Sequence, residues 1–166
     1  MSEVRPFEYA GSGKIIFLAG PIKGAEQWQE KAITLIRGLD KSVIIASPRK
    51  KGETYSDDYS EEKYLHQVEW ETHHLRRAGK EGVILFWLAK EKDHFCTRAY
   101  AQTTRFELGE WTTKHKLNGV KLVLGIEEGF SGDAYIKRRL NQDSPDTIIK
   151  NSLEDTCYEL IRVLNH

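Results

Sequence analysis

Two glutamates stand in settings that suit nucleophilic or acid–base chemistry. Glu107 lies in the segment TTRFELGEW (103–111), which is predicted to be helical and carries this acid between apolar neighbours. Glu71 lies on an earlier predicted helix, and Gln67 stands four residues before it on the same helical face. Two carboxylates at one cleft can attack a glycosidic carbon and move the proton that its cleavage requires. The alternative is that both are solvated helix residues among the 25 acidic residues of the chain.

The order of the predicted elements places Glu107 at a cleft. Apolar runs predict buried strands, and apolar residues at helical spacing predict helices between them. The expected strands cover 14–20, 42–47, 82–89, 120–126 and 147–150, and the expected helices cover 25–39, about 60–79, about 103–118, a short segment within 127–146, and 152–164. This alternation favours a parallel sheet with helices on both faces. Ligands bind such sheets outside the carboxyl ends of the strands, and the helix of Glu107 begins just after the third strand.

The chain is interpreted as one domain over 1–166, in which 1–13 form a loose N-terminal arm and the polar segment 48–60 forms a long loop. The second predicted helix is expected to bury a stripe made of Leu65, Val68, Thr72, Leu75 and Gly79. Trp70 then points away from this stripe. An outward tryptophan suggests a subunit interface, so we expect a homo-oligomer, either a dimer or a larger assembly.

Composition excludes several classes of partner. The formal net charge is +0, so nothing steers the chain toward nucleic acid polymers or anionic membranes. The sequence holds no apolar run of the ~20 residues that a membrane span needs, and the first residues lack the apolar core of a signal peptide. Cys96 and Cys157 are far apart, which fits a reducing cytoplasm. The histidines lack an H-E-x-x-H motif, so no metal and no cofactor are expected.

Other side chains are candidates for substrate contacts. In AGPIKG (19–24), Gly20 lets the backbone approach a ligand and Pro21 fixes the turn, although a tight strand-to-helix turn explains both equally. The aromatic candidates are Phe17, Trp87 and Trp111, which suit a planar base but also suit the core.

Polar and basic side chains complete this set. Thr104 and Arg105 precede Glu107 on its helix, and Arg49 follows the second strand. The two arginines, with Lys50 and Lys51, could contact a phosphate or offset the charge of the acids, and the alternative is that they are solvated.

Five segments, taken together, resemble the nucleoside 2-deoxyribosyltransferase-like family, in its bacterial and phage branch. They are IIFLAGPI, SPR, QVEWETHHLRRA, VILFW and TTRFELGEW, and they occur in this order within about 14–126. The resemblance implies a flavodoxin-like α/β fold, a three-layer sandwich whose parallel sheet is expected here to have five strands. It also implies cleavage of the N-glycosidic bond of a 2′-deoxynucleoside, transfer of the sugar to another base, and subunits that complete one another's sites.

The resemblance also implies roles for single residues. Glu107 stands in the Glu-Leu-Gly setting of the family's nucleophile, and its neighbours Phe106, Leu108 and Gly109 are then expected to pack the helix closely on the sheet. Glu71 stands seven residues before Ala78 and matches a second acid that binds near the reacting centre. The better-known transferases carry Asp six residues before the nucleophile, where this chain has Ala101.

Three functions therefore stay open at the level of sequence. The first is a nucleoside deoxyribosyltransferase that works by a retaining double displacement through Glu107. The second is an N-glycoside hydrolase of a nucleotide or NAD-like compound, with water as the acceptor. The third is a non-catalytic nucleotide-binding module. In all three the partner is a small-molecule nucleoside or nucleotide.

Overall fold

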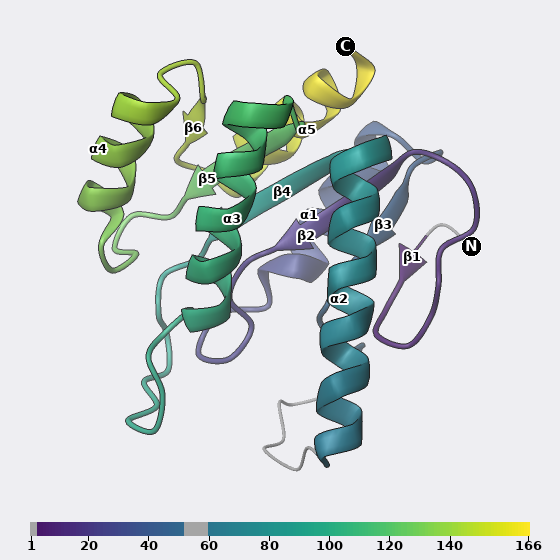
Figure 1. Ribbon diagram of the computed structural model, residues 1–166, viewed down its shortest axis with the longest axis horizontal. Coiled ribbons are helices and arrows are strands. Elements are labelled where there is room, and N and C mark those ends of the chain that lie inside the picture. The colour runs from purple at the N-terminus through teal and green to yellow at the C-terminus, as the bar shows by residue number, and fades with distance from the viewer. Residues whose placement is uncertain (1–2, 52–59) are drawn as a thin grey trace.

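The computed structural model describes residues 3–51 and 60–166, and it contains a parallel sheet between two layers of helices (Figure 1). Its strands are β1 (Glu3–Val4), β2 (Ile15–Ala19), β3 (Ile44–Ala46), β4 (Val83–Leu88), β5 (Leu122–Ile126) and β6 (Ile149–Lys150). Its helices are α1 (Trp28–Leu39), α2 (Glu61–Glu81), α3 (Gln102–Asn118), α4 (Asp133–Asp143) and α5 (Leu153–Asn165). Most of the expected loop over 48–60 lies outside the described residues.

The strand order creates one point where ligands characteristically bind. The order is β1-β3-β2-β4-β5-β6, and each neighbouring pair is parallel. From β2 the chain crosses through α1 to β3 on one side, and α2 then carries it to β4 on the other side. The chain therefore leaves β2 and enters β4 over opposite faces, which makes the β2–β4 boundary the switch point of a flavodoxin-like sheet.

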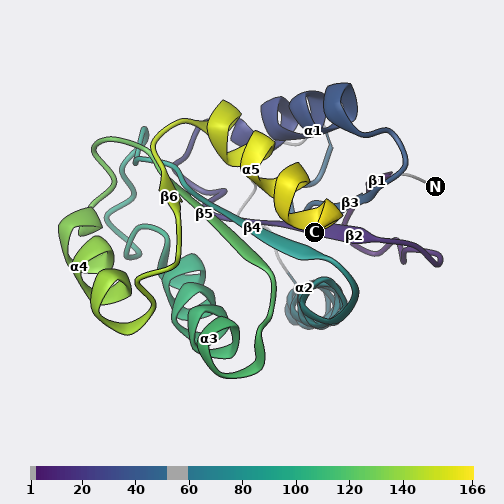
Figure 2. The same cartoon turned by 90° about the horizontal axis from the view of Figure 1, so that it is seen from above.

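The sheet and the helices on its two faces form three layers (Figure 2). Two apolar cores hold these layers together. α1 and α5 cover one face and share a core with side chains such as Leu18 and Leu85, while α2 and α3 cover the other face over Phe17 and Phe86. Every residue of β2 and of β4 is buried, which explains why both strands are continuous apolar runs in the sequence. The α/β fold and the three-layer arrangement are confirmed, but the sheet has six strands and not five.

The additional strand is β1, and it corrects the expectation that residues 1–13 form a loose N-terminal arm. Glu3–Val4 forms β1 and pairs with β3, and Ser47 donates its backbone N–H to the carbonyl of Val4 at 3.1 Å. Val4 is fully buried, and Arg5 is only 9% exposed. A two-residue strand that contributes one apolar side chain has no periodicity that a sequence pattern can reveal.

The buried face of α2 also differs from the expectation. Leu65 and Val68 are exposed, whereas Trp70 and His74 are fully buried. The first half of α2 extends beyond the sheet (Figure 1), so its apolar side chains have no strand beneath them. The indole N–H of Trp70 instead donates to the carbonyl of Glu8, and its ring lies against Phe17 of β2. Trp70 is therefore a core residue and does not face outward.

The ends of both long helices match their sequence signals, but the packing of α3 does not match the expectation. Ser60 caps α2 by accepting the backbone N–H of Lys63, and Gly119 ends α3 in a left-handed conformation. Phe106 is 75% exposed and a methyl group on Gly109 would meet nothing, so neither packs α3 on the sheet. Leu108 is buried and makes that contact. No helix of the described residues is both long and apolar enough to cross a bilayer.

Candidate active site

A cavity of about 310 Å³ opens at the switch point, between the carboxyl end of β2 and the helices α2 and α3. The segment after β3 also contributes to its wall. It is lined by Phe17, Ala19, Gly20, Pro21, Ile22, Lys23, Pro48, Tyr64, Gln67, Val68, Glu71, Arg98, Ala101, Gln102, Thr103, Thr104 and Glu107. Its position is the one that the topology of the sheet predicts for a ligand.

The turn that follows β2 forms one wall of this cavity. A methyl group on Gly20 would lie 2.3 Å from the carbonyl oxygen of Trp87, so only glycine lets the chain leave β2 along this path. The carbonyl of Pro21 accepts hydrogen bonds from the indole of Trp28 at 2.9 Å and from the side-chain amide of Gln29 at 3.3 Å. These contacts from α1 hold the turn against the cavity.

Glu107 lies on α3 and lines the cavity about one helical turn after the start of that helix. Its burial raises the pKa of its carboxyl group to about 8, and the negative charges of Glu71 and Glu110 add to this effect. No hydrogen bond or cation from the described residues offsets the increase. The Glu107 carboxyl group therefore holds its proton to a higher pH than a solvated glutamate does.

Glu71 faces the same cavity from α2. Its pKa is raised mainly by burial, and a hydrogen bond from Gln67 partly lowers it. The side-chain nitrogen of Gln67 donates to the Glu71 carboxylate at 2.8 Å and also approaches the carbonyl of Pro48 at 3.5 Å. Gln67 therefore fixes the orientation of Glu71, as the spacing of four residues predicts.

Burial disfavours the ionised form of both carboxyl groups. Because both groups are buried and the negative charge of Glu71 disfavours ionisation of Glu107, the pair holds a proton at a pH at which separate glutamates would both be ionised. Such a pair contains one group that can attack as a carboxylate and another that can donate or accept a proton. This is the chemistry that breaking a glycosidic bond requires.

Most of the substrate-binding residues expected from the sequence line the cavity. Phe17, Gly20, Pro21, Gln67 and Thr104 all contribute to its wall, together with Glu71 and Glu107. Trp87, Trp111, Arg49 and Arg105 do not line it.

The two tryptophans lie in the core. Trp87 belongs to the apolar core beneath α1 and α5, on the face of the sheet opposite to α2 and α3. Trp111 packs against Gly79 of α2, where a methyl group would lie 2.6 Å from its ring. Both aromatic side chains follow the alternative interpretation of core packing.

The two arginines lie outside the wall of the cavity. Arg105 donates to the carbonyls of Tyr100 at 3.3 Å and Ser131 at 2.7 Å, and its guanidinium stacks on Phe130 at 4.5 Å. These bonds attach the start of α3 to the turn before α4. Arg49 lies directly after Pro48 of the cavity wall, and burial lowers the pKa of its guanidinium.

Sequence reasoning missed two basic residues at the cavity, Lys23 and Arg98. The ammonium group of Lys23 lies 4.8 Å from the centre of the Phe95 ring, in the loop that also carries Arg98. The backbone N–H groups of Lys92 and Asp93 both donate to the carbonyl of Gly24, so this loop docks on the turn after β2. A polar loop directly after a central strand is the signal that could have identified both cations.

Ala101 marks the start of α3 and also lines the cavity. It is 7% exposed and adopts a left-handed conformation with φ of 55°. Within the described part of the chain, no group of three His, Cys, Asp or Glu side chains could hold a metal ion.

Comparison with known proteins gives a consistent assignment. The sequence model of the family described as "Nucleoside 2-deoxyribosyltransferase like" matches residues 13–125. The fold is similar to that of a conserved protein from Enterococcus faecalis V583, with a TM-score of 0.52 and 15% identity over 91% of this chain and 99% of that one. At this identity the crystal structure supports the fold alone. Comparison with curated proteins gave no significant match.

The family match covers more than half of the chain, and it includes β2, α2, β4 and α3. These elements supply both glutamates of the cavity. The chain belongs to the nucleoside 2-deoxyribosyltransferase-like family.

Proposed function

We propose that this protein cleaves the N-glycosidic bond of a 2′-deoxynucleoside and transfers the sugar to another base, with Glu107 as the nucleophile. One observation carries the proposal: Glu71 and Glu107, from two different helices, meet at the cavity of the switch point. Both have raised pKa values, which is common for the acids of active sites. Family membership supports a related glycosyl-transfer reaction.

The reaction would proceed in two displacements. In the first, an oxygen of the ionised Glu107 forms a bond to C1′, the C1′–N bond breaks, and its electron pair leaves with the base. The departing base takes up a proton from the site or from water. In the second, a nitrogen of the acceptor base attacks C1′ and gives up its proton to the site or to water, the ester bond breaks, and Glu107 regains its carboxylate. Two inversions at C1′ return the original configuration.

Glu71 would assist both displacements without bonding to C1′. Its hydrogen bond from Gln67 leaves the other carboxylate oxygen available to a sugar hydroxyl or to a proton in transit. Because Glu71 raises the pKa of Glu107, protonation of Glu71 would favour the ionised nucleophile.

A second candidate is hydrolysis of a nucleotide or NAD-like compound, with water in place of the acceptor base. Lys23 and Arg98 favour it. They bring two positive charges to the cavity, where they can bind a phosphate that the two glutamates alone would repel. Ala101 favours it as well, since this position lacks the carboxyl group that the better-known transferases have there.

The decisive experiment incubates the purified protein with a panel of 2′-deoxynucleosides and their 5′-monophosphates, with and without a free acceptor base. Formation of a new nucleoside only when the base is present supports the transferase. Release of base and free sugar or sugar phosphate in either condition supports the hydrolase. Tight binding of a panel member without turnover would refute both and identify a non-catalytic binding module.

We also retain the proposal that the protein is one domain and assembles as a homo-oligomer. Trp70 takes no part in that interface, because it is fully buried within one chain. Light scattering of the purified protein measures the assembly directly, and a mass equal to that of one chain would refute it.

A further inference from the structure

The segment before β2 forms a strap that connects β1 to α2 and passes close to the cavity wall. We define the strap as residues 3–13. Besides the pairing of β1, hydrogen bonds from α2 hold the strap. The indole of Trp70 donates to the carbonyl of Glu8, and the guanidinium of Arg77 donates to the carbonyls of Ala10 at 2.9 Å and Gly13 at 3.1 Å. The family match begins at residue 13, so the strap lies almost entirely outside the part of the chain that defines the family.

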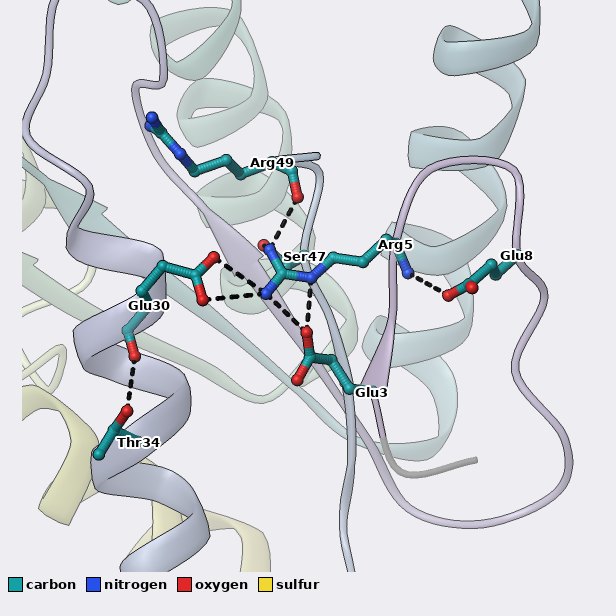
Figure 3. Close-up of polar contacts among 7 residues, drawn as sticks. All are labelled: Glu3, Arg5, Glu8, Glu30, Thr34, Ser47 and Arg49. Carbon is teal, nitrogen blue, oxygen red and sulfur yellow. Dashed lines mark hydrogen bonds and ion pairs between the residues drawn. The ribbon is translucent and has the colours of Figure 1, made fainter. Parts of the chain in front are cut away.

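Arg5 is the polar centre of this strap (Figure 3). Its guanidinium forms ion pairs with Glu3 at 2.6 Å and with Glu30 of α1 at 2.9 Å. It also donates to the hydroxyl of Ser47 at 3.4 Å and to the carbonyl of Arg49 at 2.8 Å. The side chain of Arg5 is only 11% exposed, so these bonds are shielded from water.

Ser47 and Arg49, which accept these hydrogen bonds from Arg5, lie on either side of Pro48, and Pro48 lines the cavity. The carbonyl of Pro48 is in turn approached by Gln67, the residue that donates to Glu71. A continuous series of contacts therefore leads from Arg5 through residues 47–49 to Gln67 and Glu71. Arg5 itself does not line the cavity.

We propose that Arg5 is a positioning residue, through which the strap sets the Pro48 wall of the cavity and thereby the affinity for substrate. Proline lacks a backbone N–H, so Pro48 cannot be held by a donor bond of its own. Bonds from one guanidinium to the residues before and after it restrain the segment instead. The kinetic part of this inference rests on the proposed function, whereas the structural part does not.

Arg77 provides a matched control. Like Arg5, it is an arginine that fastens the strap, but it does so through the backbone carbonyls of Ala10 and Gly13, away from Pro48. Arg5→Gln and Arg77→Gln should both loosen the strap and lower the melting temperature. Only Arg5→Gln should disturb the cavity wall.

The first measurement is amide hydrogen exchange followed by mass spectrometry, which needs neither substrate nor activity. We expect a peptide covering residues 46–51 to exchange about tenfold faster in Arg5→Gln than in the wild type, and unchanged in Arg77→Gln. Equal exchange of this peptide in the two variants would overturn the proposal. If Arg5→Gln fails to fold, Arg5→Lys takes its place, because lysine can keep the ion pairs but not all of the bonds to residues 47–49.

The second measurement is steady-state kinetics with whichever member of the nucleoside and nucleotide panel is turned over. Arg5→Gln should raise KM about tenfold with little change in kcat, Arg5→Lys should raise it less, and Arg77→Gln should leave it unchanged. An equal KM in Arg5→Gln and Arg77→Gln would overturn the positioning role. If no panel member is turned over, the proposed function fails while the exchange result still decides the role of Arg5 on the wall.

Discussion

Glu71 and Glu107 reach one cavity from two different helices, and the negative charge of Glu71 helps to raise the pKa of Glu107 to about 8. A carboxyl group with this pKa is a poor nucleophile below neutral pH and becomes effective as it ionises. Ionisation of Glu71 on α2 is therefore coupled to ionisation of Glu107 on α3.

The first prediction concerns the nucleophile. Glu107→Ala should lower turnover by several orders of magnitude, because the covalent step has no substitute, while the variant remains folded by circular dichroism. Steady-state assays on the active panel member measure the loss. Glu69→Ala is the control, since Glu69 is exposed on α2, does not line the cavity and has no part in the raised pKa of Glu107. More than about a tenth of wild-type activity in Glu107→Ala would rule out the covalent role.

The second prediction concerns the pH dependence of activity. Because ionised Glu107 is the reactive form, kcat/KM should rise with pH and level off above about 8. Glu71→Gln removes a negative charge that raises this pKa, so the same rise should occur at lower pH, and the maximal rate should fall less than in Glu107→Ala. A pH–rate profile of each protein checks both points. A Glu71→Gln profile identical to that of the wild type would show that Glu71 takes no part in the reaction.

The third prediction concerns stability and follows from the same pKa. Its folded-state value of about 8 is above the ordinary 4.5, so the protonated form favours folding. This contribution is fully present below pH 4.5 and is lost as the pH rises through about 8. Glu107→Gln cannot ionise, so it should melt at least about 2 °C above the wild type near pH 9 and no higher near pH 4. Thermal melts that keep the same offset at both values would contradict a raised pKa.

The fourth prediction concerns Ala101, which lines the cavity in a left-handed conformation that Asp and Asn adopt more readily than most residues. Ala101→Asp would place a proton donor where the better-known transferases have one, and it should release the base at least about tenfold faster. Ala101→Asn has the same shape without the acid and serves as the control. Equal rates for the two variants would show that an acid at this position adds nothing.

The fifth prediction separates folding from assembly at α2. Trp70 is fully buried, so Trp70→Ala should destabilise the protein by about 3–5 kcal/mol. Leu65 on the same helix is 52% exposed, and Leu65→Ala should cost less than about 1 kcal/mol. Urea denaturation measures both. A Trp70→Ala protein as stable as the wild type, but with a smaller mass by light scattering, would instead place Trp70 at a subunit interface.

Sequence patterns predict the central elements of this fold and fail at its edges for physical reasons. β2 and β4 are buried on both faces, so their apolar runs are unambiguous. β1 depends on pairing with β3 and on the bonds of Arg5, which involve partners more than 40 residues away in the chain. On α2, Leu65 and Val68 have the spacing of core residues, but this half of the helix extends past the sheet and Val68 borders the cavity.

The residues of the candidate site also differ in how well the sequence predicts them. Topology and the carboxylates identify the cavity, because ligands bind at the switch point and acids rarely lie near a core without a function. The aromatic and basic candidates are less predictable. Trp111 has the helical spacing to share a face with Glu107, yet it packs on Gly79, and Arg105 turns to the carbonyl of Ser131. Which way such a long side chain turns depends on partners that are distant in the sequence.

The most direct test of the central claim is to trap the covalent intermediate. The protein would be incubated with a 2′-fluoro-substituted nucleoside, whose electron-withdrawing fluorine disfavours the positively charged transition state and slows breakdown of the ester. After acid quenching and proteolysis, mass spectrometry would locate any attached sugar. We predict that the added mass lies on the peptide containing Glu107 and is absent in Glu107→Ala. Base release by the wild type with no labelled peptide, or with the label on another residue, would contradict the account.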